Sequence, residues 1–112
     1  MNKYDIKDPL ISQEIEKFVS LLISSNIPVK KVILFGSFAT GKQHQYSDID
    51  LAVISSPFES DEIEEMMHLA KLSSKASDRI EAVSLREEYL QSKYDTLAGE
   101  INKYGQIVYQ SN

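Results

Sequence analysis

With 112 residues, of which 42% are hydrophobic and 26% charged, the chain has the size and composition of one small globular domain spanning residues 1–112. The lack of cysteine excludes disulfides and thiolate metal sites, and no apolar run reaches the roughly 18 residues that a membrane span needs. A net charge of −5 argues against nucleic acid as a partner, because phosphate backbones are bound by basic faces. We therefore expect a cytoplasmic protein without membrane association.

The first half of the chain predicts one helix and two strands. Apolar residues at spacings of three, four and seven predict an amphipathic helix over 10–24. The β-branched run 29–35 predicts a central strand, and 36–47 reads as a turn with a polar loop. Alternating apolar residues predict a second strand over 49–54. A loop this short cannot hold a helical crossover, so the two strands should be antiparallel.

The next segment predicts a helix that begins at Ser60 or Asp61 and runs to about residue 73. Acidic residues in its first turn suit the positive end of the helix dipole. Met66 and Met67 follow helical spacing, and we expect them to fill the core.

The last third predicts a strand, a long helix and a short closing strand. The strand covers about 79–85. Ser84 is placed to cap a helix over 85–104, with Glu87 at the capping-box position, and Gly105 would end this helix. The run 107–109 could add a last strand. The predicted fold class is therefore α/β (α+β), a mixed sheet with helices packed against it.

Two carboxylates stand two positions apart on the second predicted strand. The two-residue period of a strand points Asp48 and Asp50 to the same face, roughly 6.5–7 Å apart. Their like charges would repel unless a cation lay between them, and Mg²⁺ prefers such oxygen ligands. The first strand ends directly in Gly36 and Ser37, whose backbone N–H groups and hydroxyl could hold phosphate. Antiparallel pairing would place this turn beside the carboxylates.

A third carboxylate, Glu81, lies between apolar residues on the third predicted strand. If that strand neighbours the second, Glu81 can complete a metal site. Asp78 and Glu88 are its substitutes, although neither lies in an apolar strand pattern. Each feature alone also has a bland interpretation as a surface residue or an ordinary turn, and the combination is what favours a functional site.

The stretch LFGSFATGKQHQYSDIDLAVI resembles the signature of the DNA polymerase β superfamily of nucleotidyltransferases: an apolar strand, Gly-Ser, ten residues, Asp-x-Asp and a second apolar strand. RIEAV resembles the later strand that carries the third carboxylate. The resemblance implies the polymerase-β-like nucleotidyltransferase fold, with Gly36 and Ser37 holding the triphosphate. It also implies that Asp48, Asp50 and Glu81 bind magnesium and that Glu81 helps to deprotonate the attacking hydroxyl. Many relatives carry Asp at this third position.

The short length resembles the minimal nucleotidyltransferases (MNT) of HEPN/MNT toxin–antitoxin pairs. The implied reaction moves a nucleoside monophosphate, AMP from ATP, to a hydroxyl with the help of two Mg²⁺ ions. The implied acceptor is a tyrosine on a helical HEPN-type toxin, which would also close a site that so short a chain leaves open; a second copy of the chain could do the same.

Five further side chains could have a role at the site, each with a structural alternative. Lys42 could reach the triphosphate or remain a solvated loop lysine. Phe38 and Tyr46 could stack on a base or pack on the sheet. His44 and His68 are lone histidines, which are more often surface or packing residues than ligands.

Two other functions compete with transfer to a protein. One is transfer to a small molecule such as an aminoglycoside, against which the absence of a second domain argues. The other is a non-catalytic subunit that binds a nucleotide or a partner, against which the complete set of site residues argues.

Overall fold

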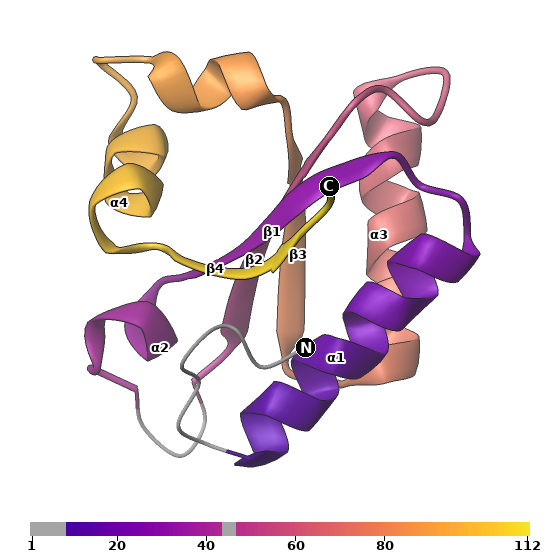
Figure 1. The fold of residues 1–112 in the computed structure, drawn as a ribbon, viewed down its shortest axis with the longest axis horizontal. Coiled ribbons are helices and arrows are strands. Elements are labelled where there is room, and N and C mark those ends of the chain that lie inside the picture. Colours follow the sequence, from indigo (N-terminus) through magenta and orange to yellow (C-terminus); the bar gives the residue numbers. More distant parts are fainter. Residues whose placement is uncertain (1–8, 44–46) are drawn as a thin grey trace.

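The computed structural model describes residues 9–43 and 47–112, and in it a four-stranded sheet carries helices on both faces (Figure 1). In chain order the elements are α1 (Pro9–Ser24), β1 (Val29–Phe35), α2 (Ser37–Thr40), β2 (Ile49–Ser55), α3 (Glu62–Ala76), β3 (Ile80–Leu85), the 3₁₀ helix η1 (Glu87–Gln91), α4 (Thr96–Tyr104) and β4 (Gln106–Gln110). Among the helices of these two ranges, none is long and apolar enough to cross a membrane.

The sheet has the strand order β3-β2-β1-β4. β1 pairs antiparallel with both β2 and β4, whereas β2 and β3 are parallel. These pairings confirm the predicted mixed sheet and the antiparallel first pair. They also show that the third strand neighbours the second, which was the condition for Glu81 to join the site. Because β1 and β2 are antiparallel, the end of β1 lies beside the start of β2, as the sequence predicted.

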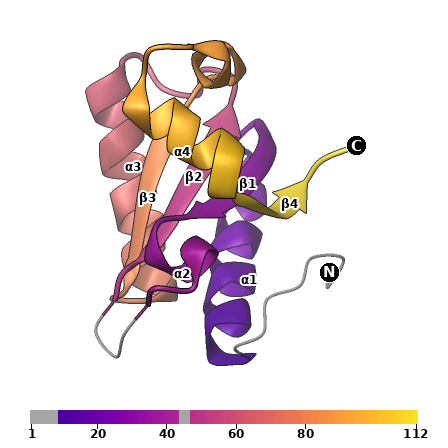
Figure 2. The same ribbon diagram turned by 90° about the vertical axis from the view of Figure 1, so that its left-hand side faces the viewer.

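Each face of the sheet has its own apolar core, because side chains of a strand alternate between faces. Helices α1 and α3 cover one face, where they pack on residues such as Leu34 and Leu51. Helix α4 and η1 cover the other face, where Phe35 and Ala52 lie in a smaller core (Figure 2). Asp48, Asp50 and Ala52 are spaced by two, so the Asp-x-Asp pair belongs to the face of α4.

The prediction that Met66 and Met67 fill the core is wrong, because their exposed fractions are 61% and 67%. Helix α3 is also three residues longer than predicted, and Asp61 is its N-cap. The side of α3 that packs against the protein carries Leu69, Leu72 and, unexpectedly for a carboxylate, Glu65, which is 1% exposed. Since Glu65 occupies the buried stripe, the two methionines are turned outward.

The predicted helix over 85–104 is also wrong, because β3 continues to Leu85 and is followed by η1, a break and the shorter α4. Ser84 does not cap a helix: it lies in β3 and its hydroxyl donates to Glu65 at 3.0 Å. Asp95 caps α4 instead, accepting from the Ala98 N–H at 3.0 Å.

Gly105 ends α4 as predicted, and the structure leaves no room for a side chain at this position. A Cβ on Gly105 would lie 2.4 Å from the Ile101 carbonyl oxygen and 2.6 Å from Ile33 Cγ2. A larger residue would push α4 away from β1, and α4 brings a further carboxylate to the end of that strand.

Candidate functional site

The strand register brings the predicted carboxylates to one edge of the sheet. Asp50 is paired with Phe35 of β1 on one side and with Glu81 of β3 on the other. Paired residues of parallel strands point to the same face, so the Asp50 and Glu81 side chains lie side by side. Asp48 lies one residue before β2, and its charge acts on the Asp50 carboxyl. Asp48 and Glu81 are exposed and Asp50 is half-buried.

Gly36 lies directly against the Asp50 carboxylate. A Cβ at this position would lie 2.2 Å from Asp50 Oδ2, closer than any real contact. The backbone of Gly36 also has φ 74° and ψ −152°, a conformation that is essentially restricted to glycine. Only a glycine can therefore connect β1 to α2 while Asp50 packs against the turn.

The carboxylates at this edge repel one another. Burial, followed by the negative charges of Glu81, Asp48 and Glu100, raises the pKa of Asp50 to about 6. Within residues 9–43 and 47–112, no three His, Asp or Glu side chains are already arranged around a metal position. Mg²⁺, however, is usually held by one or two carboxylates together with substrate phosphates. The donor set therefore fits Mg²⁺ bound jointly with a nucleotide.

Two charged residues at this edge were missed by the sequence analysis. Glu100 of α4 accepts a hydrogen bond from the Gly36 N–H at 3.2 Å and contributes to the raised pKa of Asp50. Arg79, just before β3, donates to the Ser47 carbonyl at 3.2 Å, and its guanidinium lies 5.4 Å from the centre of the Phe38 ring. Arg79 could have been suggested by its spacing of two from Glu81. No sequence signal indicates Glu100, because the position of Glu100 depends on how α4 packs.

Three further candidates, Ser37, Phe38 and Lys42, lie in α2 or directly after it. Ser37 begins α2, and its half-buried hydroxyl has no hydrogen-bond partner among the residues that the structure describes. Lys42 follows α2 with an exposed side chain, so contact with a nucleotide remains a prediction. Phe38 packs against the larger core, which favours its structural alternative.

Of the other aromatic and histidine candidates, Tyr46 and His44 lie outside the described residues. His68 binds Glu59 Oε2 through Nδ1 at 2.8 Å, and its ring centre lies 6.0 Å from that of Phe58. It therefore has the packing role that the sequence analysis favoured.

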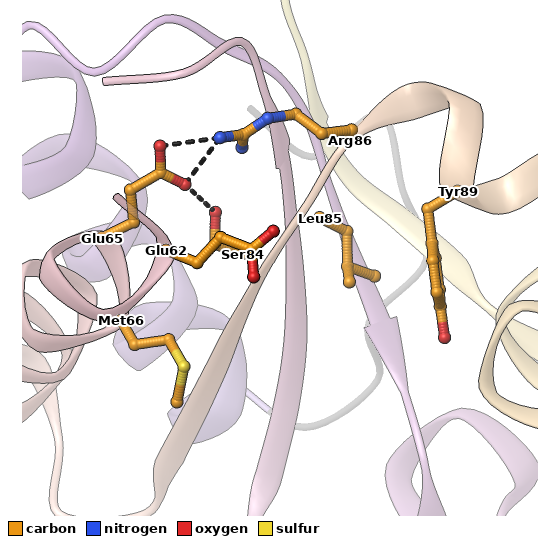
Figure 3. A pocket seen from close by; sticks show the side chains of 7 residues that line it. All are labelled: Glu62, Glu65, Met66, Ser84, Leu85, Arg86 and Tyr89. Carbon is orange, nitrogen blue, oxygen red and sulfur yellow. Dashed lines mark hydrogen bonds and ion pairs between the residues drawn. The ribbon is translucent and has the colours of Figure 1, made fainter. Parts of the chain in front are cut away.

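A cavity of about 290 Å³ lies away from these carboxylates, at the opposite end of β3 between α3 and η1 (Figure 3). Its wall contains Glu65, whose two oxygens accept from Arg86 Nη2 at 2.9 and 2.7 Å. Burial opposes ionisation of Glu65, but hydrogen bonds from Arg86, the Phe58 N–H and Ser84 outweigh it and lower the pKa of Glu65. This buried, fully paired carboxylate holds α3 to β3.

Comparisons with known proteins agree with this fold. Residues 13–112 match the family Polymerase beta, Nucleotidyltransferase. No curated protein sequence matches significantly. A solved toxin–antitoxin complex with AMP-PNP is 30% identical, with a TM-score of 0.62, over 87% of this chain and 73% of that one.

Two further solved structures extend the comparison. A variant of the MntA–HpeT toxin–antitoxin is 26% identical with a TM-score of 0.62, over 87% of this chain and 73% of that one. A proposed nucleotidyltransferase from Sulfolobus solfataricus, 18% identical with a TM-score of 0.53 over 98% of this chain and 92% of that one, shares the fold alone. The family match covers nearly the whole chain, and the chain therefore belongs to the polymerase β nucleotidyltransferase family, as a minimal member of it.

Proposed function

We propose that this nucleotidyltransferase transfers AMP from ATP to a tyrosine hydroxyl of a helical HEPN-type partner, and that it acts as the antitoxin of that pair. One observation carries the proposal: Asp50 lies against the Gly36 turn and beside Glu81, in a chain 30% identical to a toxin–antitoxin structure solved with AMP-PNP.

In this proposal Asp48, Asp50 and Glu81 hold Mg²⁺. The mutual repulsion of the carboxylates supports this role, because it makes the site favourable for cations. When bound, two Mg²⁺ ions would neutralise charge on the triphosphate and lower the pKa of the attacking hydroxyl. Glu81, which is exposed, is the residue that accepts the proton of that hydroxyl.

The turn after β1 holds the triphosphate in this proposal. The Ser37 hydroxyl donates to a phosphate oxygen, and Lys42 reaches the triphosphate from the loop that follows α2. The acceptor oxygen then forms a bond to the α-phosphorus, the bond from this phosphorus to the bridging oxygen breaks, and pyrophosphate leaves.

Two relatives support the choice of acceptor and partner. One solved MntA–HpeT complex carries two aspartates, two positions apart, changed to glutamate, which is the spacing of Asp48 and Asp50. Another MntA–HpeT complex, 27% identical over 88% of this chain, carries a tyrosine changed to alanine. An aspartate pair and a tyrosine were thus replaced in those complexes. In our proposal an aspartate pair of this chain holds the metal and a tyrosine of its partner is the acceptor.

Incubating the chain with a HEPN partner, Mg²⁺ and ATP labelled at the α-phosphate tests the proposal. We expect label on the partner, lost when its acceptor tyrosine is replaced by phenylalanine. Asp50→Asn and Glu81→Gln should abolish transfer. Asp78→Asn, which removes an exposed carboxylate from the turn before β3, should preserve it. If the wild type binds the partner but transfers no label, the non-catalytic alternative is correct.

A further inference from the structure

Two carboxylates meet at one glycine in this protein. Asp50 Oδ2 lies 2.2 Å from the position that a Cβ of Gly36 would occupy, and Glu100 Oε2 accepts from the Gly36 N–H at 3.2 Å. The two acidic side chains come from different elements, one from β2 and the other from α4. Backbone N–H groups at a glycine turn are the donors that phosphate oxygens use. Glu100 therefore occupies a donor that the proposed triphosphate would use.

Among the residues that the structure describes, Glu100 forms no ion pair. Over residues 9–43 and 47–112, the ion pairs involve other acidic residues, Glu59, Glu65 and Glu87. Glu100 is half-buried, so its repulsion of neighbouring anions is less screened by water than that of an exposed residue. Its hydrogen bond from the Gly36 N–H places it within the site, and its charge is one of those that raise the pKa of Asp50.

We infer that Glu100 is a specificity-determining residue that makes the site reject metal-free nucleotide and accept only its magnesium complex. A free triphosphate meets the carboxylate of Glu100 at the Gly36 N–H, in addition to the charges of Asp48, Asp50 and Glu81. The magnesium complex carries less negative charge and can displace Glu100 from this N–H. The inference rests on the proposed function, because it assumes that the Gly36 turn binds triphosphate.

Calorimetric titration tests the inference by comparing the affinity of wild type and Glu100→Gln for AMP-PNP. Each protein is titrated once with excess Mg²⁺ and once with EDTA. Glutamine keeps the shape and an oxygen that can accept from Gly36, but it lacks the charge. We expect Glu100→Gln to bind AMP-PNP in EDTA about fivefold more tightly than wild type, or more, so that the dependence on Mg²⁺ shrinks. Glu88→Gln removes an exposed charge in η1, at the far end of β3, and should leave both affinities unchanged.

Glu100→Ala provides a second variant, expected to change the affinity in EDTA in the same direction. Unchanged or undetectable binding by both Glu100 variants in EDTA would overturn the inference. Weaker binding by Glu100→Gln in Mg²⁺ would also overturn it, since Glu100 would then hold the metal. A wild type that binds no AMP-PNP even with Mg²⁺ would instead count against the proposed function.

Discussion

Replacing Asp50 with asparagine should stabilise the metal-free protein while removing its activity. Burial and the neighbouring charges of Glu81, Asp48 and Glu100 raise the pKa of Asp50 from its ordinary 3.8 to about 6. The difference between these two pKa values corresponds to about 3 kcal/mol. Because Asp50 is only half-buried, water reduces much of this penalty of burial and repulsion, and we expect a gain of about 1 kcal/mol in the free energy of unfolding.

The sign of this effect depends on pH. A carboxyl whose pKa is raised by folding favours the folded state while it is protonated, and this contribution is lost as the pH rises through about 6. Urea unfolding in EDTA should therefore show a larger advantage of Asp50→Asn over wild type at about pH 7.5 than at about pH 4.5. Adding Mg²⁺ should stabilise the wild type more than the variant, because the cation binds only where the carboxylates remain.

Glu88→Gln is the matched control, since it removes one exposed negative charge far from the site. The reasoning is refuted if Asp50→Asn is no more stable than wild type in EDTA at about pH 7.5, or if Glu88→Gln gains as much. Either result would mean that burial and the neighbouring carboxylates do not disfavour the ionised form of Asp50 in the folded protein.

Three further predictions follow from contacts in the structure. Gly36→Ala should cost about 2 kcal/mol or more in unfolding free energy and abolish AMP-PNP binding, because it combines a strained backbone with a clash against Asp50. Gly41→Ala, which has a similar φ of 75° but no atom within 4 Å of the added Cβ, should cost only about 1 kcal/mol and keep AMP-PNP binding; equal losses would contradict the role of Gly36. Arg86→Met should cost about 3 kcal/mol by urea unfolding, because it leaves the buried Glu65 carboxylate without its cation, and unchanged stability would refute this. The loss in Arg86→Met should shrink in acid, where the uncompensated Glu65 carboxylate of the variant takes up a proton; a constant loss would contradict this.

The sequence predicted the first two strands, the helix before them and the site at their junction because these depend on local patterns. A β-branched run, a glycine and two aspartates at a spacing of two determine where the strands end and where their side chains point. Antiparallel pairing then follows from the short loop alone, and the structure adds the register that places Asp50 between Phe35 and Glu81.

The errors concern residues whose environment is set by distant parts of the chain. Met66 and Met67 are exposed because Glu65 takes the buried position. The burial of Glu65 depends in turn on its ion pair with Arg86, 21 residues later. The helix predicted from residue 85 fails for the same reason, since Arg86 is held in an extended conformation at the end of β3. Glu100 reaches Gly36 across 64 positions, and no local pattern indicates such a contact.

The most direct measurement of the central claim is a crystal structure of the protein with Mn²⁺ and AMP-PNP, in which anomalous scattering locates the cation. The account predicts an anomalous peak within about 2.2 Å of carboxylate oxygens of Asp48, Asp50 and Glu81, with the phosphates beside Ser37. A peak at another carboxylate, or a nucleotide bound away from the Gly36 turn, would contradict it.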